Sequence, residues 1–220
     1  MNGMISCLMT ARRYNLTDRL LGELEHALRV VVARPRAARP APDAEQTGEL
    51  SSSEQQLGAS LMRVNHAGEI AAQALYRGQA AVARDDQQRQ ELLTAAGEEH
   101  DHLAWCRDRA EALGGRISML TPFWYAGSFA LGTAAGLAGD KISLGFLAET
   151  ERQVTAHLDE HLQRLPEKDA NSRAILEQMR AEEIKHGQIA TDRGGRELPK
   201  AIKTTMRAAS KVMTTISFRL

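Results

Sequence analysis

Two pairs of a glutamate and a histidine, each three residues apart, have the residue types of a metal site. The pairs are Glu99 with His102 and Glu183 with His186. Residues three apart lie on one face of a helix, so each pair presents a carboxylate and an imidazole together. Both groups are ligands of first-row transition metals. A single pair of this kind is usually a solvated surface pair, so the argument depends on the repetition.

A further glutamate precedes each pair at nearly the same distance. Glu69 stands 30 residues before Glu99, and Glu151 stands 32 residues before Glu183. An antiparallel hairpin of helices with its turn midway would bring each single glutamate level with its pair. Two such hairpins would direct four carboxylates and two imidazoles at one level of a bundle, where unpaired charge is costly unless a metal binds. This is the ligand pattern of ferritin-like di-iron carboxylate proteins. We therefore predict a di-iron centre with the ligands Glu69, Glu99, His102, Glu151, Glu183 and His186.

The glutamates that directly precede these pairs, Glu98 and Glu182, do not form a further Glu-x-x-His pair. Glu98 is three residues before Asp101, and Glu182 is three residues before Lys185. Neither pairing joins a glutamate to a histidine along one helix, so we assign neither glutamate to the centre.

The elements that must position these ligands are four long helices of an all-α, ferritin-like four-helix bundle. Ala, Leu, Glu, Gln and Arg dominate the composition, and aromatic residues make up only 4%, which favours helix over sheet. The pairs Gly114–Gly115 and Gly194–Gly195 are typical helix ends. The helices are expected at residues 53–83, 86–113, 140–164 and 168–193, within a ferritin-like di-iron domain that covers residues 53–195.

An N-terminal arm, residues 1–52, precedes this bundle. Thr17 and Asp18 can begin a short helix over residues 17–33, whose apolar stripe would dock on the bundle or lie on a membrane surface. Residues 34–52 hold three prolines and no apolar period, which indicates a linker. The first eleven residues lack a basic start and do not resemble a secretory signal.

Residues 117–139 form a stretch of 23 residues without charge. The length would cross a bilayer, but a crossing would place the two hairpins on opposite sides of the membrane. The stretch is therefore either a crossover packed on the bundle or an element that enters one leaflet. Trp124 and Tyr125 suit a membrane interface. The basic amphipathic tail, residues 196–220, would rest on anionic lipid or fold back over the bundle.

The charge balance and the cysteines exclude some classes of function. The 28 basic and 28 acidic residues balance, which removes the electrostatic argument for nucleic-acid binding. The two cysteines, Cys7 and Cys106, form no framework, as expected in a reducing compartment.

Other residues near the expected ligands are less clear. His157 follows Glu151 by six residues, about 240° around a helix, which disfavours direct ligation but allows a part in proton or electron handling beside the ligands. His66 is either such a neighbour or an exposed residue, and His100 and His161 are expected on the surface. Gly68, beside Glu69, indicates either a bound group or tight helix packing.

In order along the chain, these motifs resemble the Coq7 family, the demethoxyubiquinone hydroxylases. The resemblance covers residues 57–195 most closely. It rests on the motifs Asn65-His-Ala-Gly-Glu69, Glu99-x-x-His102, Glu151-Arg-Gln-Val-Thr-Ala-His157 and Glu183-Ile-Lys-His186.

The resemblance implies a membrane-associated di-iron monooxygenase that uses O2 to hydroxylate the demethoxyubiquinol ring late in ubiquinone biosynthesis. It implies that Glu99 and Glu183 bridge two iron ions, that His157 corresponds to a family histidine near the site, and that NADH or the quinol supplies electrons. Expected partners are a polyprenyl benzoquinol, a membrane surface, other ubiquinone-biosynthesis proteins and a second copy of the chain. The expected location is the cytoplasmic side of the cell inner membrane, as a peripheral protein.

Two alternatives remain at this point. A ferritin-like ferroxidase or iron-storage protein shares the metal site but gives no reason for an uncharged crossover. A non-catalytic helical membrane adaptor would carry its Glu-x-x-His pairs incidentally.

Overall fold

The computed structural model describes residues 16–44 and 48–220, and within these it contains seven α-helices and no strand. The four expected bundle helices are present, each end within two residues of its predicted position. The expectation for the first eleven residues lies outside the described part of the chain. The helices are α1 Leu16–Val32, α2 Ser52–Val82, α3 Asp86–Ala112, α4 Thr121–Leu137, α5 Asp140–Arg164, α6 Ala170–Asp192 and α7 Lys200–Ser217.

Local side chains begin and end the bundle helices where the sequence indicates. Ser51 and Glu54 form a capping box at the start of α2. Asp85 accepts a hydrogen bond of 2.6 Å from the backbone of Gln88 at the start of α3. Gly114 and Gly194 have φ of +77° and +86°, so the predicted glycine ends of α3 and α6 are confirmed.

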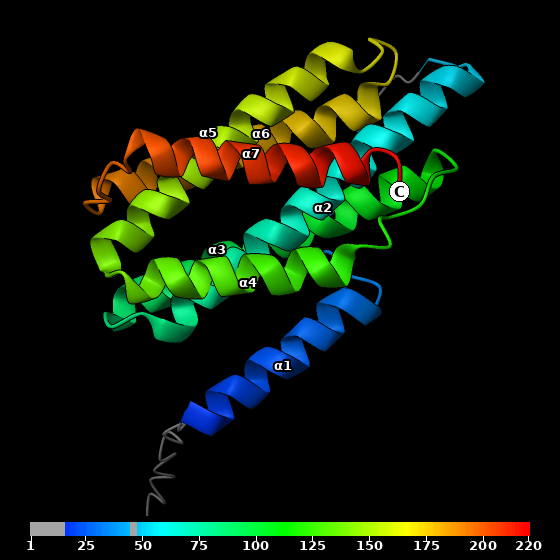
Figure 1. The fold of residues 1–220 in the computed structure, drawn as a ribbon. Helices are drawn as coiled ribbons and strands as arrows, with labels where there is room; N and C mark the ends of the chain where they lie inside the picture. The colour runs from blue at the N-terminus through cyan, green and yellow to red at the C-terminus, as the bar shows by residue number, and fades with distance from the viewer. Residues whose placement is uncertain (1–15, 45–47) are drawn as a thin grey trace, which may run out of the picture.

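Two antiparallel hairpins make the bundle, and the other helices lie on it (Figure 1). Helices α2 and α3 form the first hairpin, and α5 and α6 form the second. Helix α4 runs along α2 as the crossover between the hairpins, and α7 returns over α2 and α5. Among the described residues, no helix combines the length and the apolar character that crossing a bilayer requires.

Apolar layers lie on both sides of the ligand level. One layer contains Leu61, Trp105, Leu158 and Met179, one from each bundle helix. The other layer contains Tyr76, Leu92, Leu147 and Ala190, again one from each helix. The ligand positions fall between these layers along every helix, so water is excluded from both sides of the polar level.

Glycines bring α4 against α2 backbone to backbone. A methyl group added at Gly132 would overlap the carbonyl of Leu75, and one added at Gly78 would overlap the carbonyl of Phe129. Tyr125 is only 5% exposed in the cluster that α1, α2 and α4 share, so its expected place at a membrane interface is wrong. The uncharged stretch is thus packed on the bundle along one side.

The C-terminal tail folds back over the bundle. The guanidinium of Arg63 in α2 donates hydrogen bonds of 2.7 Å and 2.6 Å to the carbonyls of Ser217 and Phe218. These bonds fix the end of α7 on α2.

We expect Gly132→Ala to destabilise the fold because the new methyl group must push α4 away from α2. Overpacking of this kind costs about 1–3 kcal/mol, which urea unfolding followed by circular dichroism would measure. The control is Gly127→Ala in the same helix, where an added Cβ has no atom within 4 Å. That variant should be unchanged or up to about 1 kcal/mol more stable. Equal stability of the two variants would contradict the close contact.

Candidate metal centre

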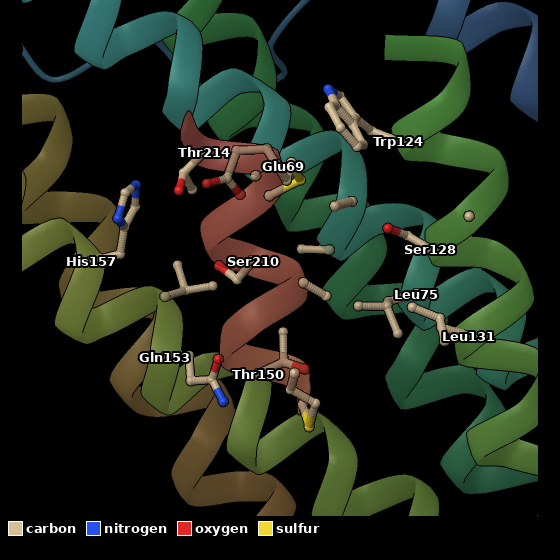
Figure 2. A pocket seen from close by; sticks show the side chains of 18 of the residues that line it. Glu69, Leu75, Trp124, Ser128, Leu131, Thr150, Gln153, His157, Ser210 and Thr214 are labelled. Carbon is tan, nitrogen blue, oxygen red and sulfur yellow. The ribbon is translucent and has the colours of Figure 1, made fainter. Parts of the chain in front are cut away.

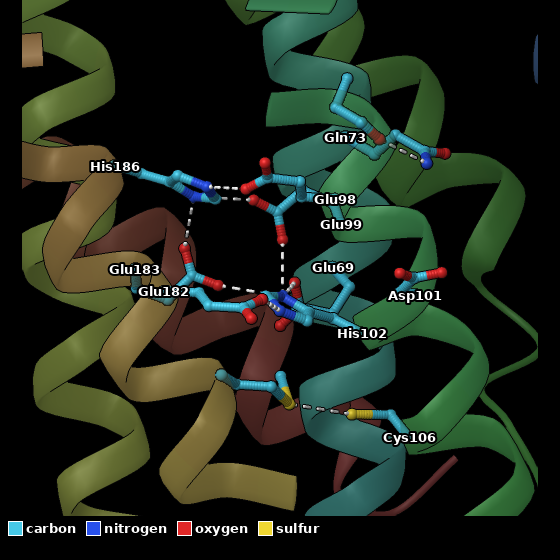
Figure 3. A network of polar contacts seen from close by, with 12 residues as sticks. Glu69, Gln73, Glu98, Glu99, Asp101, His102, Cys106, Glu182, Glu183 and His186 are labelled. Atoms are coloured by element: carbon cyan, nitrogen blue, oxygen red, sulfur yellow. Dashed lines mark hydrogen bonds and ion pairs between the residues drawn. The ribbon is translucent and has the colours of Figure 1, made fainter. Parts of the chain in front are cut away.

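The structure brings all six predicted ligands together at one level of the bundle. Figure 3 shows five of them, Glu69, Glu99, His102, Glu183 and His186. The six ligands come from four helices: Glu69 from α2, Glu99 and His102 from α3, Glu151 from α5, and Glu183 and His186 from α6. None of the six residues is more than 6% exposed. The hairpin geometry predicted from the two spacings is therefore present.

Two of the glutamates face both histidines. Glu99 places Oε2 at 3.0 Å from Nδ1 of His102 and Oε1 at 3.5 Å from Nδ1 of His186. Glu183 places Oε1 at 3.2 Å from Nδ1 of His102 and Oε2 at 3.5 Å from Nδ1 of His186. Each of these carboxylates thus offers one oxygen to each of two adjacent centres.

The other two glutamates each face one histidine. Oε2 of Glu69 lies 3.6 Å from Nδ1 of His102, and Oε1 of Glu151 lies 3.8 Å from Nδ1 of His186. The hydroxyl of Tyr76 donates a hydrogen bond to the same Glu151 oxygen. The result is two overlapping groups of four donors that share Glu99 and Glu183.

The four buried carboxylates of this cluster need added positive charge if all of them are to be ionised. Burial raises the pKa of Glu69 and of Glu151 well above the usual range. Burial would raise the pKa of Glu99 as well, but hydrogen bonds from His102 and His186 lower it. Without added positive charge, the four carboxylates cannot all ionise in this dry layer. Two divalent cations would neutralise four carboxylates and leave both imidazoles neutral as ligands.

Several nitrogen and oxygen atoms of the ligand side chains are buried without a hydrogen-bond partner. They are Oε1 of Glu99, Oε2 of Glu151, Oε1 of Glu183 and Nδ1 of His186. Buried polar atoms are rarely left in this state. The donor set therefore fits a pair of transition-metal ions.

Two glutamates that we had not assigned to the site bond the outer nitrogens of the histidines. Oε2 of Glu182 lies 2.7 Å from Nε2 of His102, and Oε2 of Glu98 lies 2.5 Å from Nε2 of His186. Each glutamate thus contacts the histidine of the opposite hairpin. A carboxylate on the outer nitrogen fixes the tautomer and turns the other nitrogen toward the metal. The signal in the sequence is the doubled glutamate that opens each Glu-Glu-x-x-His.

Two of the remaining histidines, His66 and His161, are fully buried. His161 is only 1% exposed and its Nδ1 lies 2.9 Å from Oδ1 of Asn65, so the prediction of a surface residue is wrong. His66 is also 1% exposed, so the alternative that it is an exposed residue is wrong. The ring of His157 packs 3.9 Å from that of His161, and burial lowers the pKa of His157 to about 4. His157 is therefore neutral at pH 7.

An apolar cavity of about 310 Å³ reaches the ligand level between α2, α4, α5 and α7 (Figure 2). Glu69 lines it at one point and His157 at another. Gly68 also lines it, and a Cβ added there would have no atom within 4 Å. Tight packing therefore does not explain this glycine, and open space beside Glu69 does.

Comparison of the sequence with known proteins shows the family of this chain. A family model described as "Ubiquinone biosynthesis protein COQ7" matches residues 56–217. This range includes all six candidate ligands and the helices that line the cavity.

Relatives that match over nearly their whole length carry one name, "3-demethoxyubiquinol 3-hydroxylase". The chain is 52% identical to one from Ralstonia pickettii, with 93% of this chain and 100% of the relative covered. It is 54% identical to one from Xanthomonas campestris (95% and 97% covered) and 51% identical to one from Nitrosococcus oceani (96% and 99% covered). Neither iron storage nor a membrane adaptor finds support among these relatives. The chain belongs to the COQ7 family of ubiquinone biosynthesis proteins.

Proposed function

We propose that this protein is a monooxygenase that hydroxylates the ring of 3-demethoxyubiquinol with O2 at a di-iron centre. The observation that carries the proposal is the pair of overlapping four-donor groups that share Glu99 and Glu183. The names of the relatives supply the substrate and the reaction class.

Two iron ions are the metals that suit this donor set. Glu69 and His102 would hold one iron, Glu151 and His186 the other, and Glu99 and Glu183 would bridge them. The two irons would activate dioxygen for insertion of one oxygen atom into the ring. The apolar layers of the bundle would keep water away from the place where dioxygen and the ring meet.

The apolar cavity is the proposed binding site of the quinol ring. A quinol carries hydroxyl groups that need partners once they leave water. Nε2 of His157 is buried without a hydrogen-bond partner, and its neutral ring offers a donor or an acceptor there. We assign His157 to this contact, and the bound quinol or NADH to the supply of electrons.

Exposed apolar side chains on α1, α4 and α7 suit a membrane. Phe123 and Leu131 of α4 line the cavity and are still 72% and 53% exposed. Val212 of α7 and Leu24 of α1 are 56% and 57% exposed, and α7 carries Lys200, Lys203, Arg207 and Lys211. Apolar side chains next to basic ones favour anionic lipid. We propose peripheral binding to the cytoplasmic side of the inner membrane. Contacts with other ubiquinone-biosynthesis proteins and with a second copy stay predictions.

We expect Glu183→Ala to abolish hydroxylation because it removes an oxygen from both metal positions. Wild-type protein reconstituted anaerobically should hold about two irons per chain, and the variant should hold fewer than one. A strain lacking the gene should accumulate demethoxyubiquinone and be restored by wild type but not by the variant. Exposed Glu177 lies on the same helix, so Glu177→Ala is the control and should behave as wild type. Full iron content in Glu183→Ala would refute the assignment.

We expect Gly68→Leu to raise KM for the quinol by about tenfold or more, which is the effect of losing about 1.4 kcal/mol of binding. The leucine would fill cavity space beside Glu69 while the iron content stays at the wild-type value. Gly97→Leu is the control because Gly97 is exposed on α3 and also has free space at its Cβ. An unchanged KM with full iron content would place the substrate elsewhere.

We expect the double variant Phe123→Ser, Leu131→Ser to lose binding to anionic vesicles in a flotation assay. Its turnover of a long-tailed quinol should fall more than its turnover of a short-tailed analogue, because only the long tail arrives from lipid. Ile184→Ser removes an apolar side chain of α6 that is 48% exposed, and it serves as the control. Equal losses on both substrates would count against a membrane role for α4.

A further inference from the structure

An arginine of the segment expected to be a linker reaches the metal centre. Arg39 lies between α1 and α2, and its Nε donates a hydrogen bond of 2.7 Å to Oδ2 of Asp101. Its two terminal nitrogens donate bonds of 2.6 Å and 3.0 Å to the two oxygens of Glu182. This is the paired geometry by which arginine binds a carboxylate most firmly.

The same Glu182 bonds His102. Its Oε2 accepts from Arg39 and lies 2.7 Å from Nε2 of His102. A continuous chain of contacts therefore runs from Arg39 through Glu182 to the histidine.

The segment around Arg39 is itself held in place. Nε1 of Trp105 donates a 3.1 Å hydrogen bond to the carbonyl of Arg39, whose guanidinium lies 5.0 Å from the Trp105 ring centre. The backbone N–H of Ala38 donates a 2.7 Å bond to Oδ1 of Asp101. Residues around Arg39 carry no helix, as expected of a linker, but they dock on α3.

In the described part of the chain, no arginine holds the outer carboxylate of the second metal position as Arg39 holds Glu182. Glu98 bonds His186 in the same way, but its side chain is 38% exposed, against 14% for Glu182. Among the described residues, no arginine or lysine forms an ion pair with Glu98. The two histidines therefore differ in how firmly their outer carboxylates are held.

We propose that Arg39 is a positioning residue for one of the two metal positions, which rests on the di-iron centre proposed above. It fixes Glu182 on Nε2 of His102 and so aims Nδ1 at the metal that Glu69 and His102 hold. The N-terminal arm thus completes one half of the centre, and the half at His186 does without it.

The test compares Arg39→Gln with Arg34→Gln in the full-length protein. Arg34 also ties the arm to α3, through Asp108 and Glu111 at 2.7 Å and 2.8 Å, but it touches neither Glu182 nor His102. Each protein is reconstituted anaerobically with ⁵⁷Fe(II), challenged with a ferrous chelator and analysed by Mössbauer spectroscopy. Loss of an outer partner typically costs about 10–100-fold in metal affinity.

In Arg39→Gln we expect one iron to be released at about 10–100-fold lower chelator concentration, with one of the two iron signals changed. Arg34→Gln should match wild type. Equal retention in both variants, or equal weakening of both irons in Arg39→Gln, would overturn the proposal. If wild type and Arg34→Gln fail to hold two irons, the proposed di-iron function fails, and that result is distinct from the others.

Glu182→Gln keeps the arm attached through Asp101 and provides the second variant. It should weaken the same iron, and the double variant Arg39→Gln, Glu182→Gln should add no further loss, because both act through one contact. An additive loss would show that Arg39 acts by another route and would refute the proposal.

Discussion

Four carboxylates buried at one level of a helical bundle impose the main constraint on this protein. Each of the four bundle helices contributes at least one of them, and apolar layers on both sides keep the level dry. Charge in such a place is costly unless it is matched by opposite charge and hydrogen bonds. The four helices therefore cannot be positioned independently, because the same cluster fixes the rotation of each about its axis.

The constraint divides the molecule into two functional sides. Helices α2, α4, α5 and α7 enclose the cavity that reaches Glu69. The arm and helices α3 and α6 carry the outer contacts of the histidines, through Glu98, Glu182 and Arg39. In the function proposed above, the first side would receive the substrate and the second would orient the ligands. A change in the cavity wall away from Glu69 would therefore alter the space for a substrate and leave the outer contacts of the histidines in place.

Much of this site could be predicted from the sequence because its signals lie along single helices. The spacing within each Glu-x-x-His and the distance from each preceding glutamate are local quantities, and helix geometry converts them into position. The glycine ends of α3 and α6 and the uncharged crossover are also local. These features gave the six candidate ligands and the four bundle helices within two residues.

The contacts between helices could not be predicted in this way. Whether Glu98 meets Asp101 on its own helix or His186 on another depends on the separation and rotation of two helices. His161 was expected outside for the same reason, because its partner Asn65 is on α2. Arg39 was missed because a proline-rich stretch shows no period, and its docking depends on Asp101, Trp105 and Glu182 far along the chain.

Because the two hairpins share their ligands, the donor groups can be completed only late in the synthesis of the chain. The ribosome synthesises the chain from its N-terminus, so α2 and α3 are made before α5 and α6. The first hairpin supplies Glu69, Glu99 and His102, but both metal positions also need Glu183. The outer partner of His102 is Glu182, which emerges 80 residues later. A nascent chain therefore lacks a complete four-donor group until α6 has been synthesised.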